Sequence, residues 1–198
     1  GPDYFGEFRD AFHQRAVAAH GHDPAEPGDF SRTLAEQIAE CVIKAHQEMQ
    51  PATLEYGEGR CEGVAFYRRF RMRDGSIAWN PGKMNPDIVR PAGPTDPTVP
   101  VIAIRQGNES TLTGMLAGFA MHLAILNDSE YGADYPYYLR RRLQGQLSPP
   151  PFIHFLQLPC CDVNHIDVSH DRPQTGHEWA ERVGGSLADA VMTALPTL

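Results

Sequence analysis

The chain has 198 residues, of which 41% are hydrophobic and 21% are charged, so it is long enough to bury the core of one globular domain. Its formal net charge of −8 argues against binding to a nucleic-acid backbone, which requires a basic face. The longest apolar run, "MLAGFAMHLAIL" (115–126), is too short to cross a bilayer, so the sequence predicts no transmembrane segment.

Two helices are predicted at the start of the chain. Residues 3–19 place apolar side chains near helical spacing. The stronger signal covers residues 31–49, where Ser31 can cap the first turn and Pro51 ends the helix. One stripe of this second helix is apolar: Leu34, Ile38, Val42 and Met49.

Extended chain and turns follow up to residue 100. Residues 52–70 have the pattern of a strand, a turn that contains glycine, and more extended chain. Residues 70–79 predict a hairpin with Asp74-Gly75 at its turn. Residues 80–100 are rich in proline, which excludes a helix or a central strand, so we predict a long loop there. A loop of this length in a compact domain is typical of a functional or a disordered segment.

Strands and helices alternate in the C-terminal half. Buried strands are predicted at 101–105, 112–126 and 151–158, and helices at 133–146 and 175–195. This alternation predicts an α/β fold, with a mixed sheet flanked by helices, in a single domain over residues 1–198. In such sheets the loops that follow strand ends form binding sites, which draws attention to the polar residues placed there.

His122 lies inside the apolar run "AGFAMHLAIL". Most histidines in such a setting are buried and bonded to the backbone. The alternative is a metal ligand near the end of a strand, because neutral imidazole suits zinc. Taken alone, the residue pattern favours the first interpretation.

The segment "CCDVNHID" follows the apolar run 151–158 and carries a second group of polar side chains. If this loop is extended, Asp162 and Asn164 face one side while His165 and Asp167 face the other. Either aspartate could orient a histidine beside a metal. An ordinary turn, with side chains bonded to nearby backbone, explains the composition equally well.

The chain has four cysteines, two of them adjacent at Cys160 and Cys161, and no CxxC spacing. This pattern predicts reduced, mostly buried thiols rather than a disulfide framework or a zinc knuckle, and it mildly favours an intracellular setting. Arg68 and Arg69 border the hairpin and the proline-rich segment, where they could clamp a substrate carboxylate or phosphate.

Several segments, in order, resemble the neutral/alkaline non-lysosomal ceramidase family, in particular its uncharacterised ceramidase-like branch. They are "FYRRFRMRDGSIAWNPGKMNPDIVRPAGPTDPTVPVI", "GFAMHLAIL", "GADYPYYLRR" and "FLQLPCCDVNHID". The resemblance covers about residues 50–170, and the proline-rich stretch makes it fairly specific.

The resemblance implies a zinc-dependent amide hydrolase, with His122 in the place of one zinc ligand. A second histidine in the family precedes the segment that "GPDYFGEF" resembles, and the other ligands, a glutamate and a tyrosine, lie far downstream. We therefore expect the N-terminal and C-terminal metal-ligand segments to be missing from these 198 residues. At the position of a serine that is important for catalysis in true ceramidases, this chain has Asn164.

The leading hypothesis is a zinc-dependent hydrolase of an amide or related acyl bond, acting on a small-molecule or lipid-like amide. His122 binds the metal, and Arg68 and Arg69 contact the substrate at the rim. The catalytic residues are Asp162, Asn164 and His165. The alternative is a truncated or degenerate member without activity that serves as a binding or assembly subunit. A site completed across a homo-oligomer is a third hypothesis.

Overall fold

The computed structural model describes residues 7–24, 30–107, 110–127 and 131–195. It divides into two compact units, Gly1–Gln50 and Pro51–Leu198, and each is described by itself. In the part of the chain that is described, no helix combines the length and the apolar character needed to cross a membrane.

The first unit contains the two predicted helices, α1 (Glu7–His20) and α2 (Phe30–Gln47). Residues 3–6 of the first predicted helix lie outside the described residues. α2 begins at Phe30, one residue before Ser31, the position that the sequence predicted as the cap. Most of the apolar stripe of the second helix is exposed, including Ile38 and Val42.

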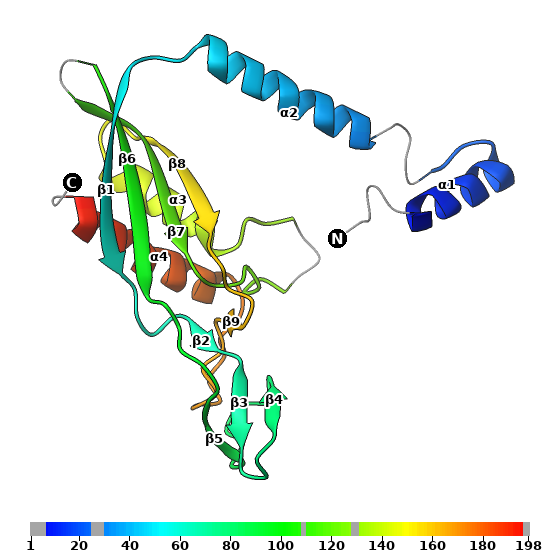
Figure 1. The fold of residues 1–198 in the computed structure, drawn as a ribbon, viewed down its shortest axis with the longest axis vertical. Helices are drawn as coiled ribbons and strands as arrows, with labels where there is room; N and C mark the ends of the chain where they lie inside the picture. The colour runs from blue at the N-terminus through cyan, green and yellow to red at the C-terminus, as the bar shows by residue number, and fades with distance from the viewer. Residues whose placement is uncertain (1–6, 25–29, 108–109, 128–130, 196–198) are drawn as a thin grey trace. The chain divides into compact units, whose positions relative to one another are not determined.

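The second unit is built on a four-stranded sheet in the order β1-β6-β7-β8. Its strands are β1 (Ala52–Arg60), β6 (Thr98–Gln106), β7 (Thr111–Phe119) and β8 (Phe152–Gln157). The first three are antiparallel neighbours, whereas β8 runs parallel to β7 (Figure 1). The sheet is therefore mixed, as predicted, and the α/β class is confirmed.

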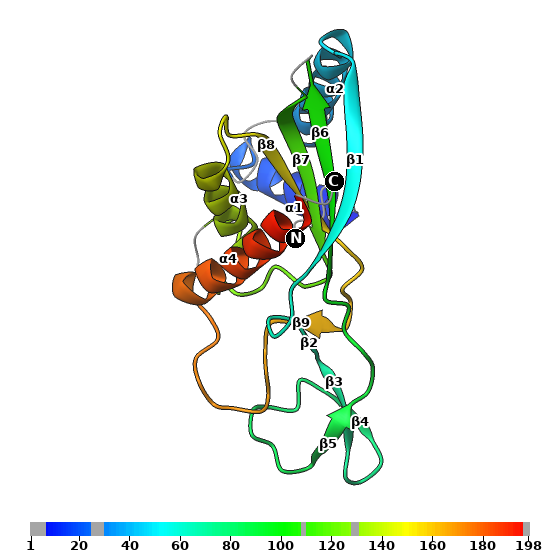
Figure 2. The same cartoon turned by 90° about the vertical axis from the view of Figure 1, so that its left-hand side faces the viewer.

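Two helices, α3 (Tyr135–Gln146) and α4 (His177–Ala194), lie on one side of this sheet (Figure 2). Because side chains alternate along a strand, Val99, Val101 and Ala103 of β6 are buried on one face. The helices contribute buried apolar side chains of their own, such as Leu139 and Leu187, to the same core. Apolar side chains on β1 and β8 remain exposed: Leu54, Tyr56, Phe152 and Leu156.

Short strands form the other end of this unit, drawn below the main sheet in Figure 1. The predicted hairpin is confirmed as β3 (Arg69–Met72) and β4 (Ile77–Trp79), with Gly75 at a positive φ of 86° in its turn. Strand β5 (Ile88–Pro91) pairs with the other side of β3. A separate pair joins β2 (Phe66–Tyr67) to β9 (Val163–Asn164), which brings together segments almost a hundred residues apart.

The proline-rich segment 80–100 is not the uninterrupted loop that was predicted. It contains β5 and the first residues of β6. β5 is an edge strand, where proline is tolerated. Pro100 pairs with Glu58 of β1, but β7 begins to pair with β6 only at Val101. Pro100 therefore lies in a central strand, but at a position that does not pair with β7. The N–H that proline lacks is not needed for a hydrogen bond to that strand.

The strand predicted at 112–126 is shorter in the structure, because β7 ends at Phe119. Residues that follow leave the sheet, and the His122 backbone N–H donates to the Val163 carbonyl at 3.3 Å. His122 thus lies just beyond the strand end, beside the loop that carries Asn164 and His165.

Candidate functional site

A pocket of about 310 Å³ lies where three segments meet. It brings together four residues singled out in the sequence: Arg68, His122, Asn164 and His165. Backbone hydrogen bonds fix their relative positions, since the Arg68 N–H donates to the Asp162 carbonyl and the Asn80 N–H donates to the Arg68 carbonyl, both at 2.8 Å. The pocket is therefore assembled by short strand pairs and turns rather than by the main sheet.

Arg68 is held on three sides. Its guanidinium carbon lies 4.3 Å from the centre of the Trp79 ring, which is a cation–π contact. Its Nη2 donates to the Cys161 carbonyl and lies 3.2 Å from Nε2 of His122. Its Nε is buried without a hydrogen-bond partner among the described residues. The planar guanidinium is thus fixed in orientation while keeping an unused donor.

The contacts of His122 determine which of its nitrogens carries the proton. An arginine can only donate, so Nε2 accepts the bond from Arg68 and is unprotonated. The proton is then on Nδ1, which donates to Sγ of Cys160 at 3.0 Å. Gln157 donates to the same sulfur at 3.4 Å. His122 is therefore half-buried and hydrogen-bonded at both nitrogens.

His165 is the opposite case. Its side chain is only 4% exposed, and neither ring nitrogen has a hydrogen-bond partner within the described part of the chain. Burial lowers the pKa of His165, Asp134 raises it, and Lys83 lowers it. The net effect is a lowered pKa, which keeps the imidazole neutral. A neutral ring presents one donor and one acceptor, and neither is used here.

Asn164 is largely committed to structure. Its side-chain Nδ2 donates to Oδ1 of Asn80 at 3.2 Å, and its Oδ1 accepts from the Ile166 N–H at 3.0 Å. An amide nitrogen carries two N–H groups, so one donor of Asn164 remains for a ligand. This hydrogen bond between exposed Asn80 and buried Asn164 ties the turn after β4 to β9.

Comparisons with known proteins bear on this arrangement at the level of the fold. No family model matches the chain, and no curated protein matches it either. A crystal structure of neutral ceramidase from Pseudomonas aeruginosa resembles it with a TM-score of 0.60 and 15% identity, over 86% of this chain and 26% of that one. A ceramidase complexed with C2 gives a TM-score of 0.56 and 15% identity, over 78% and 24%.

The fold is ceramidase-like. At this identity the resemblance establishes the fold and not the chemistry. The chain spans about a quarter of the length of these two ceramidase chains.

Asp162 and Arg69 lie outside the pocket that contains the other predicted residues. The Asp162 carboxylate accepts a hydrogen bond from the Tyr67 hydroxyl at 2.9 Å and one from Arg69 at 3.2 Å. These two contacts, Tyr67 first, lower the pKa of Asp162. The predicted clamp of adjacent arginines is therefore divided, because Arg69 pairs with Asp162 and only Arg68 lines the pocket.

The loop after β9 does not alternate as an extended chain would. Asn164 and His165 were expected on opposite sides, but both line the same pocket, because β9 is only two residues long and the chain turns after it. Buried Gln174 fixes the turn, since its amide oxygen accepts from the Asp167 N–H at 2.7 Å and its nitrogen donates to the Asp167 carbonyl at 2.9 Å.

Lys83 and Asn80 also line the pocket, although no motif or spacing in the sequence marks them as site residues. Both lie in "NPGK", where Asn80 and Gly82 have positive φ values of 45° and 94°. Lys83 donates to the Arg172 carbonyl at 2.8 Å, which ties this turn to the loop after β9. The Asn-Pro-Gly turn signal was visible in the sequence, but it does not reveal which way Lys83 points.

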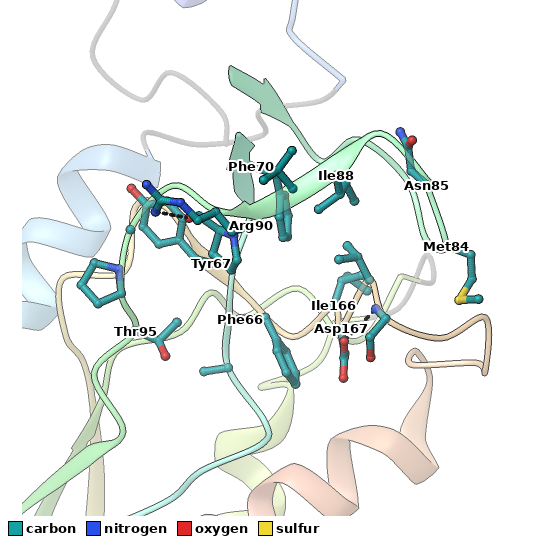
Figure 3. Close-up of a pocket in the computed structure, with 17 residues that line it drawn as sticks. Phe66, Tyr67, Phe70, Met84, Asn85, Ile88, Arg90, Thr95, Ile166 and Asp167 are labelled. Atoms are coloured by element: carbon teal, nitrogen blue, oxygen red, sulfur yellow. Dashed lines mark hydrogen bonds between the residues drawn. The ribbon is translucent and has the colours of Figure 1, made fainter. Parts of the chain in front are cut away.

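A larger pocket of about 680 Å³ shares Phe70, Ile166 and Val168 with the smaller one. Figure 3 shows its aromatic and aliphatic lining, which includes Phe66 and Ile88. Arg90 and Asp167 add charged groups. The two pockets therefore place an apolar surface beside a polar one.

The described residues do not by themselves fit a zinc ion. Nowhere among them do three or more His, Cys, Asp or Glu side chains come close enough to hold a metal. His122 and His165 line one pocket, but Nε2 of His122 accepts from a cationic guanidinium, which would repel a metal at that nitrogen. A zinc site requires three or four protein ligands.

Proposed function

We propose that this chain forms a polar pocket for hydrolysis of an amide or a related acyl bond. The observation that carries the proposal is His165, a buried imidazole whose two nitrogens are unpaired within the described residues of a pocket that also holds spare N–H donors of Arg68 and Asn164. A buried polar group without a partner is costly, so a ligand is the natural partner for these atoms. The ceramidase-like fold supports the same reaction class.

Neutral His165 acts in this proposal as a general base. It takes a proton from the attacking water while the water oxygen bonds to the acyl carbon. Arg68 and Asn164 donate to the oxygen of the tetrahedral intermediate. The protonated imidazole then returns its proton to the leaving nitrogen as the carbon–nitrogen bond breaks. Asp162 has a positioning role, because it anchors Arg69 and Tyr67 next to this loop.

The substrate class proposed is a small-molecule or lipid-like amide. The smaller pocket accommodates the polar reacting group, and the larger apolar pocket beside it accommodates a hydrophobic portion. The solved neutral ceramidases with this fold are consistent with that class. Zinc, which the sequence resemblance implies, would need ligands beyond the described residues, and no step of the proposed reaction passes through it.

Hydrolysis is tested directly by release of free amine from short N-acyl amides, with and without added Zn²⁺. We expect turnover by the unchanged chain and a loss of about 10²-fold or more for His165→Gln, the size typical of a general base. His154→Gln is the matched control, because His154 is exposed on β8 and outside the pocket. Absence of turnover in both metal conditions contradicts the hydrolase proposal and favours a binding subunit.

A further inference from the structure

The charged side chains that line the smaller pocket, among the described residues, are all positive. Among the described residues that line it are Arg68 and Lys83, and no aspartate or glutamate. The whole chain has the opposite character, with a formal net charge of −8. A concentration of positive charge in the pocket of an acidic protein indicates a ligand that carries negative charge.

Neither cation forms an ion pair with a carboxylate in the described part of the chain. Lys83 donates to the Arg172 carbonyl, and Arg68 contacts the Cys161 carbonyl and the His122 ring. Backbone carbonyls and a neutral imidazole ring accept hydrogen bonds from Arg68 and Lys83, but they carry no net negative charge that would offset these cations.

Two acidic side chains that act electrostatically on residues of this pocket are engaged elsewhere. Asp162 binds Tyr67 and Arg69. Asp134 is buried, where its carboxylate accepts the backbone N–H groups of Ile125, Leu126 and Tyr135 at 2.7–2.9 Å. Both acids are therefore held in place by other donors, and Asp162, which interacts with Arg68 electrostatically, forms its ion pair with Arg69 instead.

We infer that the smaller pocket binds an oxyanion, the carboxylate or phosphate of an acylated amine, and that the substrate is anionic rather than neutral. This inference rests on the proposed function for the reaction class, but the binding itself does not require hydrolysis. Arg68 supplies a planar guanidinium already held by Trp79, and Lys83 supplies a compact ammonium. Arg69, the other half of the predicted clamp, takes no part.

The test compares small N-acetylated amines, two of them anionic and one neutral. N-acetylglycine, its neutral amide N-acetylglycinamide, and N-acetyl-phosphoethanolamine are titrated into the ¹⁵N-labelled full chain, and Kd values are taken from amide chemical shifts. We expect one of the two anions to bind at least about tenfold more tightly than the neutral amide, as charge-assisted hydrogen bonds predict. The anion that binds more tightly identifies carboxylate or phosphate as the group recognised.

Substitutions at single residues show which side chain is responsible for the preference for the anion. Lys83→Met is expected to abolish most of the preference for the anion, and Lys83→Arg to retain it. Arg140→Met removes the same charge from an exposed position on α3 and should leave the preference intact. Equal Kd values for both anions and the neutral amide, no binding of either anion, or an equal loss in Arg140→Met would each overturn the inference.

Amine release from the same ligands separates this inference from the proposed function. Anion binding without hydrolysis upholds the inference and contradicts the hydrolase. Hydrolysis of N-acetylglycinamide as fast as that of both anionic ligands, with equal Kd values for all three, upholds the hydrolase and overturns the inference.

Discussion

The two histidines of the pocket show how environment separates identical side chains. His122 is bonded at both nitrogens and holds Arg68 and Cys160 in place. His165 is more deeply buried and has no partner at either nitrogen among the described residues. Only His165 therefore has the free donor and acceptor that acid–base chemistry requires.

This burial makes the stability of the fold depend on pH. In the unfolded chain His165 takes up a proton near its ordinary pKa of 6.5, whereas the folded protein keeps it neutral to a lower pH. Below about pH 6.5 the unfolded state thus binds more protons, and the free energy of unfolding falls as pH falls. Urea denaturation at pH 7.5 and 5.5 measures this slope.

His165→Gln should flatten the slope between those two pH values, and exposed His154→Gln should not. An unchanged slope in His165→Gln would mean that the histidine is protonated equally readily in both states.

At the scale of elements, α3 and α4 cross closely, and this contact sets the position of the two helices that cover one side of the sheet. A Cβ on Gly184 would lie 2.5 Å from the Tyr135 carbonyl oxygen and 2.7 Å from the Leu139 nitrogen. Both are backbone atoms and cannot move aside without shifting α3. α3 in turn is capped by Asp134, whose carboxylate also accepts the Ile125 N–H in the segment that follows His122.

Gly184→Ala is therefore expected to destabilise the fold by about 1–3 kcal/mol, the usual cost of overpacking a core. Gly185→Ala is the matched control, because its Cβ would meet only the Arg142 guanidinium, at 3.4 Å. Alanine is the better helix former, so this variant should be neutral or up to about 1 kcal/mol more stable. Denaturation midpoints measure both, and equal effects would show that the crossing does not depend on Gly184.

The regular elements could largely be predicted, because periodic apolar residues dictate them. The 70–79 hairpin follows from its Asp-Gly turn, and the amphipathic pattern of 175–195 predicts α4. β5 was missed, because proline content excludes central strands but not edges. Lys83 was missed for a different reason, since no periodicity governs the direction of a side chain in a turn.

The site itself could be predicted only in part. Sequence resemblance singled out His122 and the loop with Asn164 and His165, and the structure brings these residues together. The division between Arg68 and Arg69 could not be foreseen, because it depends on β2 pairing with a strand almost a hundred residues away. Pairing over such distances is set by the whole chain and not by local pattern.

At the scale of the whole molecule, the buried apolar cluster found among the described residues lies within the second unit. Its buried cluster, as far as the described residues extend, runs from Cys61 to Ala194. The four-stranded sheet, α3 and α4 all belong to the same unit. A core that draws on one unit alone should not need the other in order to fold.

We therefore expect residues 51–198, produced alone, to unfold in one cooperative transition at a Tm within a few degrees of that of the full chain, as ordinary single domains do. Circular dichroism during heating measures both transitions. A loss of cooperativity in the shorter chain would show that residues 1–50 contribute to the core.

A cationic pocket in an acidic protein also has a consequence for the rates of binding. An anion approaching from a distance meets a repulsive field from the net charge of −8, and at the pocket it is attracted by Arg68 and Lys83. Added salt screens the distant repulsion and hastens encounter, while it weakens the attraction inside and hastens release. The faster association raises the affinity and the faster release lowers it, so the equilibrium constant changes little with salt. The association and dissociation rates, measured separately, each change with salt and thereby show the charge of the pocket.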